Sequence, residues 1–260
     1  MRRYNQGGEE IRTIEVAPSL SIALLPVERA DIVPAFFRDD PERDENAFQP
    51  FLTRAEASEG RGKTAPAAYR AWLSGRMAAK AAAALLWGGP PGDQEIRKNS
   101  EGRPDLYRPG LTAGPERPRG WLSISHTRGA AAAVVSRREP VGVDLERADR
   151  PVKASMARWA FTGPERRLAE EFSDAGGYLA LWCAREAAAK CWGRALLNHL
   201  DSVRAARVDR ERGLVVVDWL GPPTARAEAE IMVYDEFMLA LAFPAEAPAG
   251  KIRAEIWPHE

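Results

Sequence analysis

The chain has 260 residues, and its 37 lysines and arginines balance 37 aspartates and glutamates, so the net charge at pH 7 is zero. This balance argues against a dedicated nucleic-acid binder, which would carry a basic surplus. No apolar run approaches the ~20 residues of a membrane helix, and no secretory leader pattern is present. We therefore expect a soluble, cytoplasmic protein that binds neither nucleic acid nor membranes.

The cysteine and histidine content excludes two further classes of site. The 2 cysteines, Cys183 and Cys191, fall on one expected helix, more than two turns apart, which is too far for a disulfide. We expect both thiols to be reduced. With only 3 histidines, the chain contains no zinc-type cluster of cysteine and histidine.

The first quarter of the chain carries little functional signal. Residues 1–11 are polar and read as a disordered tail. Residues 12–27 alternate between apolar and polar types, which predicts one or two strands broken at Pro18-Ser19. Residues 38–63 are polar and predict a long loop with a short helix.

A helix is predicted between Thr64-Ala65-Pro66, which supplies a start, and Gly88-Gly89, which supplies a stop. Its apolar stripe consists of Leu73, Met77, Ala81, Ala84 and Leu85. Arg76 and Lys80 lie one turn apart on a neighbouring face. Taken alone, this helix predicts a solvated basic edge for these two residues.

The middle of the chain contains the expected boundary between two halves. A strand over 121–125 delivers Ser125 and His126, and 130–135 forms a strand or a helix. The turn at 136–140 then separates an N-terminal half, 12–139, from a C-terminal half, 140–245. Residues 246–260 are rich in proline and alanine and are expected to form a loose tail.

The C-terminal half is expected to begin with a strand, continue with helices and end with further strands. Residues 141–146 alternate as a strand and 152–192 are mostly helical, with Thr162 as a candidate cap before Pro164. Further strands are expected near the following ranges: 206–208, 214–219, 227–233 and 237–243.

Three acidic residues from two of these elements predict a cation site. Asp144 and Glu146 alternate along a strand, so their side chains share one face. Glu186 and Lys190 are one helical turn apart and also share a face. Oxygen ligands of this kind suit Mg²⁺, and Lys190 would add a charge for a phosphate oxygen. The structural alternative is an exposed strand face beside an ordinary helix ion pair.

Ser125 and His126 do not form a nucleophile and base. Adjacent residues on a strand point to opposite faces, so they cannot act together as a catalytic triad requires. Their hydroxyl and imidazole groups fit contacts to phosphate or ribose better.

These motifs together resemble the 4′-phosphopantetheinyl transferases, and within them the monomeric surfactin-synthetase-activator type. The resemblance covers about 100–192 and rests on the order and spacing of four motifs. They are Gly102-Arg103-Pro104, Ser125-His126, Gly142-Val143-Asp144-Leu145-Glu146 and Trp182-x-x-Arg185-Glu186-Ala187-x-x-Lys190. One position departs from the family, which usually has Lys where this chain has Arg185. Arginine is a planar fork rather than a point charge, so its phosphate contact would differ.

The resemblance implies both a fold and a reaction. The fold would be α+β, with two similar halves related by a pseudo-twofold axis, the active site between them, and a monomeric protein. The reaction would move the 4′-phosphopantetheine arm of coenzyme A to a serine of an apo acyl or peptidyl carrier protein, with Mg²⁺, and release 3′,5′-ADP.

The resemblance also implies roles for individual residues. Asp144, Glu146 and Glu186 would hold Mg²⁺, and Glu186 and Lys190 would be catalytic. The following residues would contact coenzyme A: Arg76, Lys80, Arg103, Ser125, His126, Arg185 and Lys190.

Two alternatives stay open at this point. The same three acids would serve another Mg²⁺-dependent phosphoryl enzyme such as a nuclease, which nucleic-acid cleavage assays would reveal. A catalytically silent relative would bind coenzyme A or a carrier protein without turnover.

Overall fold

The computed structural model divides the chain into two compact units. Unit 1 comprises Met1–Gly8 and Pro140–Glu260, and unit 2 comprises Glu9–Glu139. The structure describes residues 32–38, 50–108, 118–172 and 176–245, together with the backbone of Arg2–Arg3, Arg12–Ala17 and Leu20–Leu24. The expected tail at 246–260 lies outside the described residues, as does all of the expected tail at 1–11 except Arg2–Arg3.

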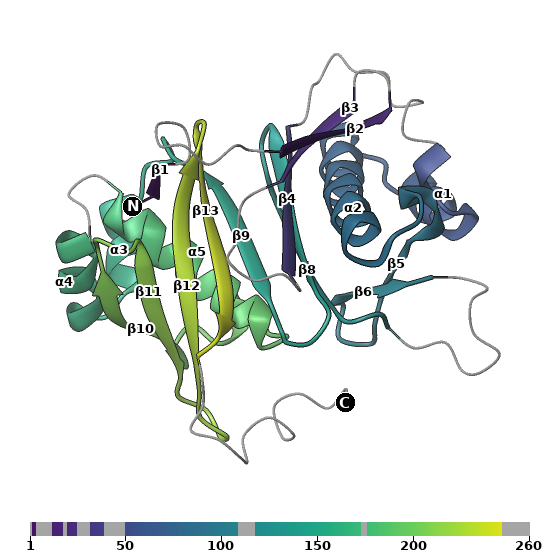
Figure 1. The fold of residues 1–260 in the computed structure, drawn as a ribbon. Coiled ribbons are helices and arrows are strands. Elements are labelled where there is room, and N and C mark those ends of the chain that lie inside the picture. The colour runs from purple at the N-terminus through teal and green to yellow at the C-terminus, as the bar shows by residue number, and fades with distance from the viewer. Residues whose placement is uncertain are drawn as a thin grey trace. The chain divides into compact units, whose positions relative to one another are not determined.

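Unit 2 is built on an antiparallel sheet with the strand order β2-β3-β4-β8-β7 (Figure 1). Its strands are β2 (Arg12–Ala17), β3 (Leu20–Leu24), β4 (Ile32–Arg38), β7 (Trp121–Thr127) and β8 (Ala130–Ser136). The interior strand β8 pairs along its length with β4 on one side and β7 on the other, so that Ala133, for example, lies opposite both Ala35 and Ile124. Small side chains on β8 leave room for a helix to pack closely on the sheet.

That helix is α2 (Pro66–Trp87), which runs across the sheet of unit 2. It begins with proline in its first turn and ends at Gly88, whose φ of 76° suits glycine, as the sequence predicted. Leu73, Met77 and Ala81 are buried as predicted, but Leu85 is 44% exposed. The buried face extends instead over Ala78, Ala79, Ala82, Ala83 and Leu86.

Shorter elements surround α2. They are α1 (Arg54–Arg61), the 3-10 turn η2 (Pro91–Asp93) and the two-stranded sheet of β5 (Glu95–Lys98) with β6 (Pro104–Tyr107). The sequence predicted a short helix within 38–63, and α1 confirms it. It did not predict β4, β5 or β6.

Unit 1 is built on a second sheet with the order β10-β11-β12-β13-β9, all antiparallel, and β1 added parallel to β12. Its strands are β1 (Arg2–Arg3), β9 (Gly142–Arg147), β10 (Val203–Asp209), β11 (Leu214–Trp219), β12 (Ala225–Tyr234) and β13 (Phe237–Pro244). All four strands expected after the helical region are therefore present. The strand expected at 141–146 is present as β9.

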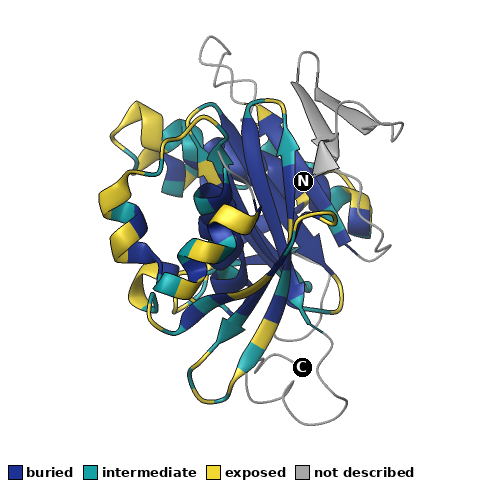
Figure 2. Cartoon of the chain, turned by 90° about the vertical axis from the view of Figure 1, so that its left-hand side faces the viewer, coloured by how far each residue is buried: buried dark blue, intermediate teal, exposed yellow. Residues whose placement is uncertain are grey.

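The helical region of unit 1 contains three helices: α3 (Ala154–Ala160), α4 (Gly163–Phe172) and α5 (Gly177–Cys191). A 3-10 turn, η3 (Leu196–Asn198), follows them. α5 packs on the sheet and α4 packs on α5, where a Cβ added to Gly177 would lie 1.8 Å from the carbonyl oxygen of Ala169. In Figure 2 the helices show both exposed and buried residues, whereas the strands behind them are mainly buried.

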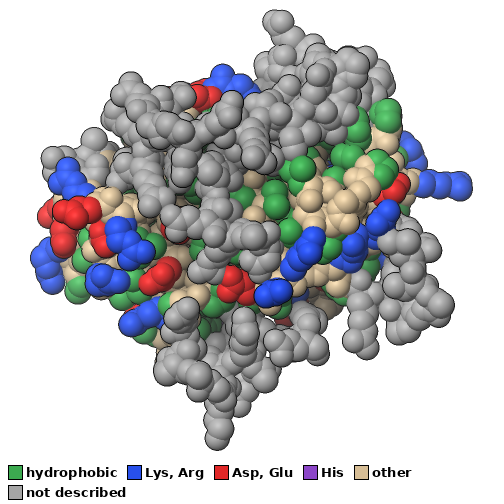
Figure 3. Space-filling view, in the orientation of Figure 1, with side chains coloured by type: hydrophobic (Ala, Val, Ile, Leu, Met, Phe, Trp, Pro, Cys, Tyr) green, Lys and Arg blue, Asp and Glu red, His purple; other side chains and the backbone are tan. Residues whose placement is uncertain are grey.

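Each unit thus places a long helix on a mainly antiparallel sheet, so the predicted α+β fold is confirmed. The pseudo-twofold relation and the exact limits of the two halves stay predictions. Figure 3 shows acidic and basic side chains interspersed over the described part of the face it presents. Within the described residues, no helix is both long and apolar enough to cross a bilayer.

Gly142 offers a direct test of how closely β9 and α5 pack. A Cβ at this position would lie 1.8 Å from the Ala187 carbonyl oxygen and 2.7 Å from the Cys191 amide nitrogen. Because backbone atoms cannot move aside cheaply, Gly142→Ala should destabilise unit 1 by about 3 kcal/mol or more. Cys183 and Cys191 are the chain's 2 cysteines and both belong to unit 1, so thiol labelling in urea reports on this unit alone.

Gly163→Ala is the matched control, because a Cβ there meets no atom closer than 3.8 Å. We expect its labelling curve to overlie that of the wild type. Equal curves for Gly142→Ala and Gly163→Ala would contradict the close packing of β9 on α5.

Candidate functional site

The candidate site in unit 1 is formed by one face of β9 and one face of α5. Asp144 and Glu146 follow Gly142 at alternate positions of β9, so they point to the side where Gly142 touches α5. On α5, Glu186 and Lys190 share a helix face. Strand and helix bring Asp144 into contact with Lys190 and place Glu186 near enough to both strand acids to feel their charge. The cation site predicted at these acids stays a prediction.

Both acids of β9 bond to basic side chains. The Lys190 ammonium donates to Asp144 Oδ1 at 2.8 Å and to the Val143 carbonyl at 3.0 Å. Arg150 Nη1 donates to Glu146 Oε1 across one turn of chain. The Asp144–Lys190 pair is more buried than the Glu146–Arg150 pair, because the Asp144 side chain is 8% exposed and that of Glu146 is 16% exposed. The Asp144–Lys190 contact was not among the predicted roles.

Glu186 has a strongly perturbed acidity. Burial, followed by the nearby Asp144 and Glu146 carboxylates, raises its pKa from 4.5 to about 7 against the opposing charge of Lys190. The carboxyl group is therefore divided between its protonated and ionised forms near neutral pH. An acid tuned to this range is suited to proton transfer.

Cys183 lies beside the same acids but has no nucleophilic character. Burial raises the pKa of its thiol well above the usual value, and Asp144 and Glu146 add to that shift. Since the thiolate is the reactive form, this thiol is unreactive at neutral pH. Both cysteines are free and buried, as expected from the sequence.

The chemistry of the three carboxylates fits a hard divalent cation, although their present arrangement does not yet form its site. Oxygen donors suit Mg²⁺, and a cation would relieve the repulsion that raises the pKa of Glu186. Over the described ranges, however, no group of three histidine, cysteine or acidic residues is placed to hold a metal ion. Asp144 and Glu146 bond Lys190 and Arg150 instead, and these pairs would have to open.

Ser125 and His126 lie near the end of β7 in unit 2. Ser125 is 7% exposed, whereas His126 is exposed, so the two side chains leave the strand on opposite faces. This arrangement agrees with the expectation that the two do not act together as nucleophile and base. His126 is accessible to a ligand.

Arg103 is not part of β7, but its side chain lies beside the first residue of that strand. Its backbone is held in the turn between β5 and β6, where Asn99 Oδ1 accepts from the Arg103 amide at 3.0 Å. Its guanidinium lies 5.4 Å from the ring of Trp121, the first residue of β7, and 3.5 Å from Asp105 Oδ1. Because a strand rises ~3.3 Å per residue, Trp121 and His126 are separated by about 17 Å. The structure does not bring the side chains of Arg103 and His126 together.

Arg76 and Lys80 do not form the solvated edge that the helix alone predicts. Arg76 is 5% exposed and Lys80 is 0% exposed. All three donors of the Lys80 ammonium are used within unit 2. They bond Glu56 Oε2 at 2.6 Å and the carbonyls of Phe51 and Gln94 at 2.7 and 2.5 Å.

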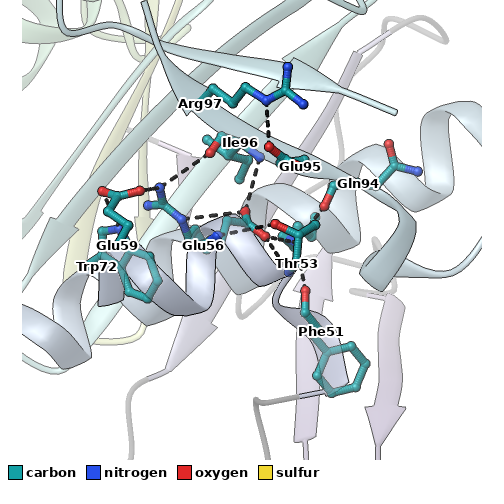
Figure 4. Close-up of polar contacts among 11 residues, drawn as sticks. Phe51, Thr53, Glu56, Glu59, Trp72, Gln94, Glu95, Ile96 and Arg97 are labelled. Atoms are coloured by element: carbon teal, nitrogen blue, oxygen red, sulfur yellow. Dashed lines mark hydrogen bonds and ion pairs between the residues drawn. The ribbon is translucent and has the colours of Figure 1, made fainter. Parts of the chain in front are cut away.

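The carboxylate that receives Lys80 is itself fully engaged (Figure 4). Glu56 Oε2 also accepts from the Thr53 amide at 2.9 Å, and Oε1 accepts from the Ile96 amide at 3.1 Å. Thr53 and Glu56 form a capping box that starts α1. This network ties α1, α2 and β5 together.

Arg76 is occupied by the second acid of α1. Its Nη2 donates to Glu59 Oε2 at 2.6 Å, and its guanidinium stacks 4.1 Å from the Trp72 ring centroid. Glu59 in turn accepts from Trp72 Nε1 at 3.0 Å. The predicted phosphate contacts of Arg76 and Lys80 are therefore not supported, because both cations are buried in ion pairs within unit 2.

The predicted phosphate contact of Arg185 is not supported either. The side chain is 0% exposed, and its guanidinium donates to the carbonyls of Ala160 and Leu200, the latter at 2.7 Å. Glu165 Oε1 lies 3.4 Å from the same group. Arg185 thus connects the end of α3 and the loop before β10 to α5. Burial lowers its pKa to about 10, so it stays charged at neutral pH.

The structural contacts of two charged residues were not predicted, although each residue has a clear local signal in the sequence. Glu165 accepts hydrogen bonds from the Thr162 amide at 2.9 Å and from the Ala205 amide at 3.0 Å. The bond to Thr162 is that of a capping box, which the Thr-x-x-Glu spacing in the sequence predicts. Arg150 follows Glu146 by four residues, and this spacing of opposite charges could have indicated their ion pair.

Comparison with known proteins agrees with the motifs of unit 1. Residues 140–242 match the model of the 4′-phosphopantetheinyl transferase superfamily. They include β9, α5 and all the acids of the candidate site. None of the curated proteins compared matches the chain.

The raised pKa of Glu186 predicts how the stability of unit 1 depends on pH. Between pH ~4.5 and ~7 the folded state binds more protons than the unfolded state, so the free energy of unfolding falls as pH rises through this window. Glutamine cannot ionise. We therefore expect Glu186→Gln, without divalent cations, to be more stable than wild type by about 1–2 kcal/mol at pH 8 and equal to it at pH 4.5.

Urea unfolding measures this difference when it is followed by pulsed hydrogen–deuterium exchange in peptides from β9 and α5. The exposed Glu170 provides the control variant Glu170→Gln, which should follow the wild type at both pH values. A constant difference between Glu186→Gln and wild type across the window would show that Glu186 ionises normally.

The ion pair of Lys80 and Glu56 predicts a second stability effect, in unit 2. Lys80→Met removes the cation that bonds the buried Glu56 carboxylate at 2.6 Å and leaves only Arg76, whose Nε lies 3.6 Å from Glu56 Oε1, which should cost about 3 kcal/mol. Glu56→Gln with Lys80→Met removes both charges and should cost less than Lys80→Met alone. Deuterium pulses on peptides of α2 give both values.

Lys98→Met, at an exposed position of β5, should change the free energy of unfolding by no more than about 0.5 kcal/mol. If Lys80→Met behaved like Lys98→Met, the buried network would have no energetic role.

Proposed function

We propose, because residues 140–242 match the model of the 4′-phosphopantetheinyl transferase superfamily, that the protein transfers the phosphopantetheine arm of coenzyme A to a carrier protein. The match supports a phosphopantetheinyl transferase activity in general. The finer proposal is that the acceptor is a serine of an apo acyl or peptidyl carrier, that Mg²⁺ is required and that 3′,5′-ADP leaves. In this proposal the protein acts as a monomer in the cytoplasm.

The observation that carries the proposal is the electrostatic coupling of three carboxylates in the matched domain. Asp144 and Glu146 raise the pKa of Glu186, which burial has already raised, to about 7. An ordinary exposed ion pair on a helix would leave Glu186 near its usual pKa. The coupling therefore favours a functional site over that structural alternative.

Asp144, Glu146 and Glu186 would hold Mg²⁺ in this proposal. When bound, the ion would neutralise charge on the diphosphate and on the leaving group. Lys190 reaches Asp144 in the same site, so its ammonium would turn to a phosphate oxygen once the carboxylate bonds the cation. Ser125 and His126 would bind the nucleotide portion, and Arg103 would contact a phosphate oxygen separately.

The chemical step exchanges one phosphorus–oxygen bond for another. The serine oxygen forms a bond to the phosphorus that bears the pantetheine arm, and the bond to the bridging oxygen breaks, so that 3′,5′-ADP leaves with the electron pair. The serine proton needs an acceptor. We assign this role to Glu186, whose carboxylate a bound cation would keep ionised. The protein otherwise contributes position and charge.

Intact-protein mass spectrometry of an apo carrier tests the proposal. After incubation with the protein, coenzyme A and Mg²⁺, we expect a mass gain of one phosphopantetheine per carrier. Glu186→Gln removes the proton acceptor and one cation ligand, so the initial rate should fall by about 100-fold or more. A chelator should abolish the gain.

The control variant is Glu170→Gln, which changes an exposed glutamate of α4 in the same domain and should keep the wild-type rate. Binding of coenzyme A without transfer to any of several unrelated carriers would instead support a silent relative. Transfer that persists in chelator would refute the role of Mg²⁺ while leaving the transferase intact.

A further inference from the structure

Arg150 has no role in the site as described so far, yet it holds one of the proposed cation ligands. It follows β9 in a turn in which its amide donates to the Arg147 carbonyl at 3.0 Å. This turn brings Arg150 Nη1 back to Glu146 Oε1. The Arg150 side chain is 42% exposed and that of Glu146 is 16% exposed, so the pair lies at the solvent edge of the acid cluster.

The pair differs from the other ion pair of the cluster. Lys190 donates to the Val143 carbonyl as well as to Asp144, and its own side chain is 27% exposed, so it is anchored on two sides. Arg150 is more exposed, and Glu146 is the partner that the structure assigns to its guanidinium. An exposed pair of this kind is weak and exchanges readily. Glu146 is therefore the carboxylate that an incoming cation can most easily free.

The two pairs also account for a disagreement between sequence and structure. The motifs predict three converging oxygen ligands, yet within the described part of the chain no three such residues are placed to hold a metal. Asp144 and Glu146 direct oxygens to Lys190 and Arg150. In the absence of a divalent cation, positive side chains of the protein occupy that electrostatic role.

We propose that Arg150 is an intramolecular competitor of the divalent cation for Glu146, and that it lowers the affinity of the site for the free ion. The inference rests on the proposed function, because it takes Glu146 as a cation ligand. Binding of the ion breaks the Arg150–Glu146 pair and releases the guanidinium to solvent. Removing the positive charge of Arg150 therefore removes this competing ion pair and leaves a more negative site.

Direct binding of Mn²⁺ to the full-length protein tests this proposal without relying on activity. Free Mn²⁺ is measured by electron paramagnetic resonance at ~0.15 M ionic strength, where charges ~8 Å or more apart are largely screened. We expect Arg150→Gln to bind Mn²⁺ about threefold to fivefold more tightly than wild type. Arg150→Lys keeps the charge and should stay closer to wild type.

Arg226→Gln is the matched control. Arg226 also belongs to unit 1 and also forms an exposed pair, with Asp218 at 2.6 Å, but it is not part of the acid cluster. Its variant should bind Mn²⁺ like the wild type. The gain of Arg150→Gln should also disappear in a Glu146→Gln background, because Arg150 acts through that carboxylate.

Three outcomes would overturn the proposal, and they separate it from the proposed function. Equal or weaker binding by Arg150→Gln, with Glu146→Gln weakened, would reject Arg150 as competitor and keep the cation site. An equal gain in Arg226→Gln would assign the effect to general charge. Absence of Mn²⁺ binding in wild type and Arg150→Gln alike would reject both the competitor and the cation role of Glu146.

Discussion

The contact between β9 and α5 at Gly142 governs the geometry of the candidate site. A side chain there would overlap the backbone of Ala187, so the strand and the helix meet at a distance that glycine alone permits. The residues that follow Gly142 on the same strand face are Asp144 and Glu146. Because the strand lies so close to the helix, these acids come within reach of Glu186 and Lys190. The glycine of the motif is therefore as necessary to the site as its acids.

Buried positive and negative charges are matched in unit 2, whereas acidic groups are in excess in unit 1. In unit 2 the Lys80 ammonium has three acceptors and the Glu56 carboxylate bonds Lys80, Thr53 and Ile96, so the network is complete. In unit 1 the charges of three acids are coupled, two of them bond Lys190 and Arg150, and Glu186 has a pKa of about 7. A complete network stabilises a fold, whereas an excess of one charge sign is costly until a ligand of opposite charge binds. This difference separates the structural role of Lys80 from the functional role proposed for Glu186.

The elements that the sequence predicted well are those with strong local signals. Proline at the start of α2 and glycine at its end fix the limits of this helix. Alternation of apolar and polar residues identifies β9, and short apolar runs identify β11 and β13. The acids of the site could also be predicted, because spacings of two on a strand and four on a helix set their faces. Leu85 was misassigned because α2 buries small alanines on a broad face rather than a narrow stripe.

The fate of Arg76 and Lys80 could not be read from α2 alone. Their partners Glu56 and Glu59 lie about twenty residues earlier, in a polar stretch whose composition predicts only a loop and a short helix. A charged residue on a helix is normally expected in solvent, and only the tertiary contact with α1 shows that these two are buried. β4, β5 and β6 were missed for a related reason, since short strands without clear alternation depend on their neighbours for pairing.

Arg185 shows how one substitution within a family signature can change the role of a position. The signature usually has Lys here, and a lysine would present a point charge that can turn toward a phosphate. The guanidinium instead donates to the carbonyls of Ala160 and Leu200 while Glu165 lies beside it. A single ammonium cannot reach these separate acceptors with the same fork geometry. Arginine at this position therefore fixes α5 to its neighbouring segments, and the neighbouring Glu186 is held in place by a residue that does not itself face the acid cluster.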